Sequence, residues 1–171
     1  QDQIEEKRRQ GVYAMPFYSV EAIYFHPEII SRIAARQADV VGGDPAEVAA
    51  KAISHGVRGI SSHTERLSRN VAKKAARKLI MERIPNDDEL LEGQEVEITN
   101  SAPHIHAARK EELDAAVLQN DWLAILTQCS IRECGARNDI IGALGFRTAS
   151  DYEKAVRHLL TVDLDALAFV R

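Results

Sequence analysis

Residues 64–84 form an uninterrupted run without glycine or proline, and they carry the clearest helical pattern in the chain. The apolar residues of this run recur at every fourth position: Leu67, Val71, Ala75 and Leu79. Because an α-helix makes one turn in about 3.6 residues, side chains at this spacing lie on one face. The run therefore predicts a long amphipathic helix and favours a helical fold.

Proline, glycine and capping residues predict the ends of the neighbouring helices. Pro27 begins one helix, and the glycine pair 42–43 ends it. Asp44 then caps a further helix that begins at Pro45. Proline suits the first turn of a helix because its missing N–H would have no partner there, and an aspartate accepts a hydrogen bond from a free N–H of the same turn. We expect Gly56 to interrupt this second helix.

The C-terminal third predicts several shorter helices, at 107–128, 131–144 and 150–162, with a remnant at 163–170. We expect the apolar face of 64–84 to pack against a second set of apolar residues: Leu113, Val117, Trp122, Ile125 and Leu126. Trp122 should be the anchor of this core. The helix at 150–162 should bury its own apolar stripe: Tyr152, Val156, Leu159 and Leu160.

Together these patterns predict a mainly α chain with a helical, bundle-like domain and one or two short β segments. The β segments are expected at 12–18, near the N-terminus, and around 96–98. Residues 1–26 indicate a helix, a short strand and the start of a further helix, and we expect residues 27–171 to form the helical domain. Within that domain, 85–106 is acidic and rich in turn residues, which indicates a connector.

Composition favours a soluble intracellular protein. Hydrophobic residues make up 45% of the 171 positions and charged residues 28%, which suffices for one ordinary core. No stretch approaches the roughly 20 apolar residues of a membrane span. The chain has two cysteines, Cys129 and Cys134, which we interpret as free thiols, and we expect a cytoplasmic location. It begins with Gln1 and a polar run unlike a signal peptide, which indicates a piece of a longer protein.

Basic residues are concentrated in one part of a chain whose net charge is −4. Residues 51–83 contain nine lysines and arginines against two glutamates. At helical spacing, the basic residues of 64–84 form a stripe beside the apolar face, and they are the candidate nucleic-acid contacts: Arg66, Arg69, Lys73, Lys74, Arg77 and Lys78. A ridge of this kind could follow phosphates along a nucleic-acid backbone.

Two other interpretations of this stripe stay open. It could be an ordinary solvated helix face. It could also pair with acidic residues of the connector folded back onto it: Asp87, Asp88, Glu89, Glu92 and Glu95. Aromatic residues are not interleaved with the basic ones, so the stripe itself shows no base-stacking pattern.

The sequence lacks a complete catalytic set. Neither a GxxxxGK phosphate loop followed by Ser or Thr nor a GxGxxG loop occurs, so the chain should not hydrolyse ATP alone. Asp87 and Asp88 lack apolar flanks that could fix their geometry or shift their pKa values, so we assign no catalytic residue.

Zinc binding is not enforced by the spacing of possible ligands. His104 and His106 are expected in a loop, with their side chains pointing apart. They could join Cys129 and Cys134 around a metal, but the four positions do not have the spacing of a structural zinc site.

Two stretches resemble a known superfamily. GVYAMPFYSVEAIYFHPEII at 11–30 resembles the segment that follows the acidic D-x-D of Toprim domains in the OLD-like ATPase and nuclease superfamily. Residues 131–171 are similar to the helical tail of bacterial proteins that join an ABC-type ATPase core to such a Toprim-like domain. The two stretches cover about a third of the chain, and the resemblance implies that residues 1–26 are the end of a Toprim-like α/β unit.

This resemblance implies a metal-dependent nuclease with an ATPase domain as the longer protein. Its partners would be the upstream ATPase and Toprim segments, with ATP bound only there, Mg²⁺ at the Toprim site and a possible homodimer. Glu21, in SVEAIY, would be a late metal-site carboxylate, since magnesium prefers oxygen ligands. Ala22 stands where the family pattern often has Asn, and a glutamate at this place also suits a helix N-terminus.

Two functions are therefore expected from the sequence. The first is the C-terminal helical portion of an ATP-dependent, Toprim-type nuclease in phage defence or DNA repair. The alternative is a non-enzymatic helical module that binds nucleic acid or a protein partner.

Overall fold

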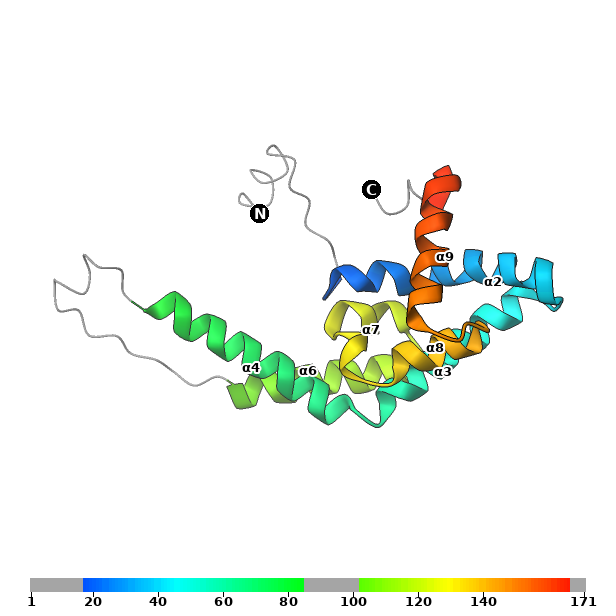
Figure 1. The fold of residues 1–171 in the computed structure, drawn as a ribbon. Helices are drawn as coiled ribbons and strands as arrows, with labels where there is room; N and C mark the ends of the chain where they lie inside the picture. Colours follow the sequence, from blue (N-terminus) through cyan, green and yellow to red (C-terminus); the bar gives the residue numbers. More distant parts are fainter. Residues whose placement is uncertain (1–16, 85–101, 167–171) are drawn as a thin grey trace.

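The computed structural model describes residues 17–84 and 102–166, and within these ranges every regular element is a helix. In chain order they are the 3₁₀ helix η1 (Val20–Phe25), α2 (Pro27–Val41), α3 (Pro45–Ser61), α4 (Thr64–Arg83), α6 (Ala102–Leu118), α7 (Trp122–Gln128), the 3₁₀ helix η2 (Ile131–Glu133), α8 (Ala136–Ala143) and α9 (Ala149–Val162) (Figure 1). The mainly α class is confirmed. Of the expected β segments, 96–98 and most of 12–18 lie outside the described residues.

Local sequence signals fix most helix ends as predicted. Proline occupies the first turn of both α2 and α3. The Asp44 side chain accepts a hydrogen bond of 3.0 Å from the backbone N–H of Ala46. Gly42 follows the last turn of α2 with a φ of +83°, a left-handed conformation in which a side chain would be strained. The expected bounds of α2 and of α4 are thus confirmed to within a residue or two.

Most of the core lies in a body made of η1, α2, α3, α7, α8 and α9, and the ends of α4 and α6 nearest this body add Leu67, Leu113 and Ala116. Its largest fully buried side chains come from several of these helices, among them Ile29, Ile60, Ile125, Ile140 and Tyr152. Trp122 is 2% exposed, so its place as a core anchor is confirmed. In α9, the predicted stripe is buried except at its last residue, Leu160, which is half-buried against the core.

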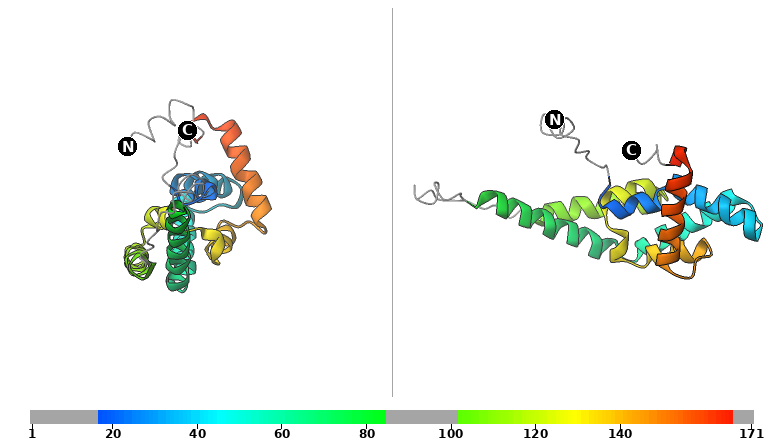
Figure 2. Two further views of the ribbon diagram at one scale, coloured as in Figure 1. Left: turned by 90° about the vertical axis from the view of Figure 1, so that its left-hand side faces the viewer. Right: turned by 45° about the horizontal axis from the view of Figure 1, so that its top comes forward.

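Helices α4 and α6 pack side by side and extend away from the body as an arm (Figure 1). The right-hand view of Figure 2 shows the same arrangement from another side. Near the body, Leu67 and Val71 lie next to Leu113 of α6, as expected. Farther out, α4 extends beyond the described start of α6, and Leu79 is 42% exposed. The expectation that Leu79 belongs to the core was wrong, because no described helix covers this end of α4.

Gly56 does not interrupt a helix, contrary to expectation. Helix α3 continues through it to Ser61. A Cβ at Gly56 would lie 2.6 Å from Cδ1 of Ile140, and one at Gly59 would lie 2.8 Å from Cα of Ala136. These glycines lie where α3 crosses α8, so they allow the two backbones to approach closely.

The helix expected at 107–128 is divided in two. Helix α6 begins earlier, at Ala102, and ends at Leu118, and α7 begins at Trp122. Asn120 between them has a φ of +54°, which asparagine tolerates better than most residues. The Asp121 carboxylate then caps α7 through the Ala124 N–H at 2.9 Å. The chain turns between the two helices, and Trp122 at the start of α7 is buried in the core.

Two further expectations concern domain limits. Residues 102–106 belong to α6, so the part of the expected connector that the structure describes is helical. Residues 85–101 lie outside the described ranges, together with the acidic residues that could fold back. Ala22 and Phe25 of η1 are buried in the same core as α2. The 1–26 unit lies largely outside the described residues, and its boundary stays a prediction.

Candidate anion-binding groove on helix α4

The six predicted basic contacts all lie on α4, and all six are exposed. They differ in whether a carboxylate neutralises them. Arg69 pairs with Glu65 at 3.0 Å, and Lys78 pairs with Glu82 at 3.5 Å, both one helical turn away. Exposed pairs of this kind stabilise a helix only slightly, but they reduce the positive charge that each cation offers to a ligand.

The other four basic residues line a groove of about 350 Å³. Its lining, which we call the basic groove, consists of Arg66, Asn70, Lys73, Lys74, Arg77 and Glu133. Five of these residues come from one face of α4, and Glu133 comes from η2 beside it. The predicted set is therefore only partly brought together, since Arg69 and Lys78 do not line the groove.

Glu133 is the residue that the sequence did not reveal. Its carboxylate Oε2 accepts a hydrogen bond of 2.7 Å from Nδ2 of Asn70, and its Oε1 lies 3.4 Å from Nζ of Lys74. Its backbone carbonyl accepts a hydrogen bond from the guanidinium of Arg66. Because it is 63 residues from Asn70 in the chain, no local pattern could have placed it in the groove.

Lys74 is held on a second side by Tyr18. Its ammonium donates a hydrogen bond of 2.6 Å to the Tyr18 hydroxyl and lies 4.8 Å from the centre of that ring. The pKa of Lys74 is raised, first because of the hydrogen bond to Tyr18 and then because of Glu133. Lys74 therefore keeps its positive charge in a fixed position at the edge of the basic groove.

Lys73 and Arg77 are the cations of the groove that have no counter-charge among the residues that the structure describes. Within residues 17–84 and 102–166, their side chains form no ion pair and no hydrogen bond. They are one helical turn apart, which places them about 6 Å apart along the axis of α4. The groove thus combines two fixed cations, Arg66 and Lys74, with two that are available to an anion.

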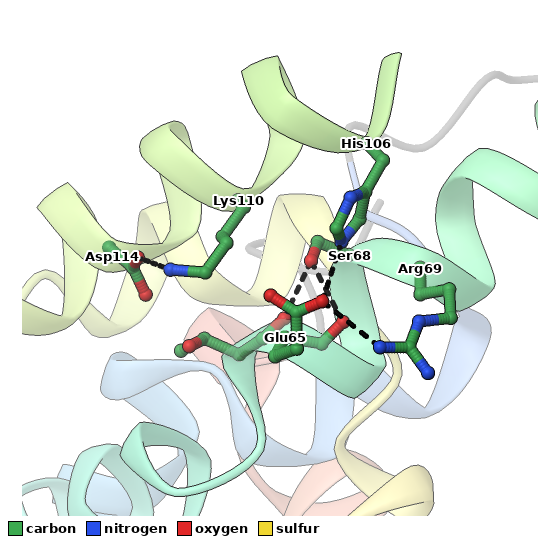
Figure 3. Close-up of polar contacts among 7 residues, drawn as sticks. Glu65, Ser68, Arg69, His106, Lys110 and Asp114 are labelled. Atoms are coloured by element: carbon green, nitrogen blue, oxygen red, sulfur yellow. Dashed lines mark hydrogen bonds and ion pairs between the residues drawn. The ribbon is translucent and has the colours of Figure 1, made fainter. Parts of the chain in front are cut away.

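A separate polar cluster lies where α4 packs against α6 (Figure 3). Glu65 lies between Arg69 and His106, with 3.3 Å from its Oε1 to Nε2 of His106. Lys110 and Asp114 pair along α6 at 2.5 Å. The expectation that His104 and His106 lie in a loop was wrong, because both residues lie on α6. His104 is exposed, whereas His106 is half-buried and its contact with Glu65 joins α6 to α4.

Glu21 does not line the basic groove. Its carboxylate pairs with the guanidinium of Arg132 at 2.6 Å. In the part of the chain that the structure describes, no group of three or more His, Cys, Asp and Glu residues could hold a metal ion. The tentative metal role of Glu21 stays a prediction.

The two cysteines are free thiols, as predicted. Burial raises the pKa of Cys129 to about 12 and also raises the pKa of Cys134. Both sulfurs are therefore protonated near neutral pH and are poor nucleophiles and poor metal ligands in the folded chain.

The chain matches no protein-family model, no curated protein and no solved structure. Among the described helices, none is both long enough and apolar enough to cross a bilayer.

Proposed function

We propose that this chain is a nucleic-acid-binding helical module and that the basic groove of α4 binds phosphate groups. The observation that carries the proposal is the pair Lys73 and Arg77, two cations one turn apart in a groove, without an acidic partner in the described residues. Like charges are costly to hold together unless an anion compensates them, and a chain of phosphates supplies such compensation.

The fixed members of the groove support the same ligand. Arg66 and Lys74 are held by Glu133 and Tyr18, so they lose little side-chain freedom when an anion binds. The position on an arm that extends from the body leaves α4 accessible to a large polymer (Figure 1). A polyanion contacting several of these cations would release counterions, which makes binding weaken steeply with salt.

The test is a titration of the chain with a fluorescent oligonucleotide over a range of salt concentrations. We expect the double variant Lys73→Glu/Arg77→Glu to reduce affinity at least tenfold at low salt. The matched control is Arg147→Glu/Lys154→Glu, which changes the net charge equally on exposed residues near and on α9. If both double variants weaken binding equally, general charge and not the groove is responsible. If the wild-type chain does not bind at low salt, the proposal is wrong.

A more specific proposal rests on the resemblance of 11–30 and 131–171. In it, the module is the cytoplasmic C-terminal portion of a longer, ATP-dependent Toprim-type nuclease, with Mg²⁺ as the metal and a homodimer as the assembly. The coding sequence upstream tests this directly, because it must encode a nucleotide-binding ATPase motif and a D-x-D pair. A longer protein lacking both would contradict it. In a parent with both, Glu21→Gln should weaken magnesium-dependent cleavage if Glu21 assists the metal site.

A further inference from the structure

The acidic residue of the basic groove, Glu133, indicates which kind of nucleic acid the groove binds. We propose, on the basis of the phosphate-binding function above, that the groove selects single-stranded nucleic acid and that Glu133 accepts a hydrogen bond from an N–H of an unpaired base. Glu133 holds Arg66 and Lys74 in place, but its exposed carboxylate oxygen also repels phosphate, which a groove for phosphates alone would not favour.

Glu133 has the capacity to accept a further hydrogen bond. Its Oε2 is engaged by Asn70 at 2.7 Å, which fixes the orientation of the carboxylate. Among the described residues, its Oε1 has only the longer contact of 3.4 Å with Lys74. An ionised carboxylate has about four acceptor positions, and this side chain is 30% exposed at the groove. Acceptor positions are therefore left for a donor from the ligand.

Unpaired bases supply donors that match this acceptor. Every base carries an N–H group on the edge that forms Watson–Crick pairs, and in a duplex those groups are occupied by the opposite strand. In a single strand the base can turn toward Glu133 while the neighbouring phosphates contact Lys73 and Arg77. Single-stranded and unpaired segments are recognised in this way, by their splayed bases.

A duplex would meet the same groove less favourably. Its outer surface presents phosphates on both strands at high density, so phosphates bound to Lys73 and Arg77 would bring others close to Glu133. The carboxylate would then be repelled and would lose water without gaining a donor. Glu133 thus lowers the affinity for a duplex relative to the affinity for a single strand. It changes the difference between the two affinities and does not raise binding in general.

The experiment measures the affinity of the full chain for a single-stranded 20-mer, for the same strand in a duplex, and for the single strand with abasic sites. For the wild type, we expect the single strand to bind about tenfold more tightly than the duplex, and the abasic strand to lose most of that advantage. Glu133→Gln keeps an acceptor for Asn70 but removes the charge. It should bind the duplex more tightly, lower the single-strand preference and make abasic sites matter less.

Glu153→Gln is the matched control, since it removes one negative charge from α9 and should leave the preference unchanged. The circular dichroism and thermal unfolding of each variant show whether it is folded. If no oligonucleotide binds the wild type, the phosphate-binding function fails and this inference fails with it. If the single strand and the duplex bind the wild type equally, the inference is wrong while phosphate binding stands. The same holds if Glu133→Gln leaves both the single-strand preference and the effect of abasic sites unchanged.

Discussion

The indole Nε1 of Trp122 donates a buried hydrogen bond of 2.8 Å to the backbone carbonyl of Phe25, although the two residues are 97 positions apart. Phe25 ends η1, and Trp122 begins α7, so this bond connects the N-terminal described segment to the point where the chain returns from the arm. The ring itself is almost fully buried among core residues. Trp122 therefore contributes both apolar burial and the partner of an otherwise isolated carbonyl.

Replacing Trp122 by Phe should destabilise the fold more than a simple loss of volume would. The carbonyl of Phe25 would lose its partner while staying buried, which costs about 1–3 kcal/mol, and the smaller ring would leave a cavity. Urea unfolding followed by circular dichroism measures the change. Leu123→Gln, at the exposed next position of α7, should change stability by less than about 0.5 kcal/mol. Equal effects at both positions would contradict the role of the indole N–H.

The glycines of the α3–α8 crossing should respond differently to alanine. Gly59→Ala would press a methyl group against the backbone of Ala136, which cannot move without shifting α8, so we expect a loss of about 1–3 kcal/mol. Gly56→Ala would meet side-chain atoms of Ile140 and Trp122 and not the backbone of α8, so it should cost less. Thermal unfolding of the two variants compares them.

Gly142→Ala is the control for these substitutions. It lies within α8, where nothing is within 4 Å of the added methyl group. Alanine is favoured over glycine in a helix by about 1 kcal/mol, so this variant should be more stable than the wild type. A destabilised Gly142→Ala, or a stabilised Gly59→Ala, would show that the crossing is not the close contact described.

Acid should destabilise the chain through His26. Its Nδ1 accepts the N-cap hydrogen bond from the Glu28 N–H at 3.1 Å, and burial lowers its pKa below the ordinary value near 6.5, with Glu28 opposing the shift. A lowered pKa means that the unfolded chain takes up the proton first. Stability is then fully present above about pH 6.5 and is lost as the pH falls below it.

His26→Asn should remove this pH-dependent part, because asparagine caps a helix without titrating near neutral pH. The free energy of unfolding, measured in urea at several pH values between 5 and 7.5, should fall with acid in the wild type and fall less in the variant. His158→Asn changes an exposed histidine of α9 and should keep the wild-type slope. Parallel slopes for wild type and His26→Asn would contradict the prediction.

The two classes of cations on α4 should contribute unequally to salt-dependent binding. The double variant Lys73→Gln/Arg77→Gln should make the slope of log K against log salt shallower by about 1.4–1.8. Each phosphate contact that is lost removes about 0.7–0.9 from the steepness of this slope. Arg69→Gln/Lys78→Gln removes the same charge from the same helix but outside the groove. It should change the slope much less, and equal changes would indicate a uniform basic face.

The helix α4 and several helix limits follow from the sequence because local interactions decide them. The starts at Pro27 and Pro45, the end at Gly42 and the long run of α4 depend on backbone geometry and capping within a few residues. The basic stripe also follows directly, because the side chains of α4 keep helical spacing whatever the helix contacts.

Tertiary structure decided the rest, because it depends on which segments lie beside each other. The apolar pattern of α4 gave no sign that Leu79 lies beyond the helices that cover Leu67. Gly56 reads locally as a helix breaker, yet it allows α3 to approach α8 closely.

The basic groove shows the same division. The sequence determined that α4 carries a row of cations, which helical spacing alone dictates. Only the packing of η2 and residue 18 against α4 decided which cations are held by Glu133 and Tyr18. Lys73 and Arg77 have no such partner in the described part of the chain. These contacts join residues more than 50 positions apart, and their energies depend on distances that exist only in the folded chain.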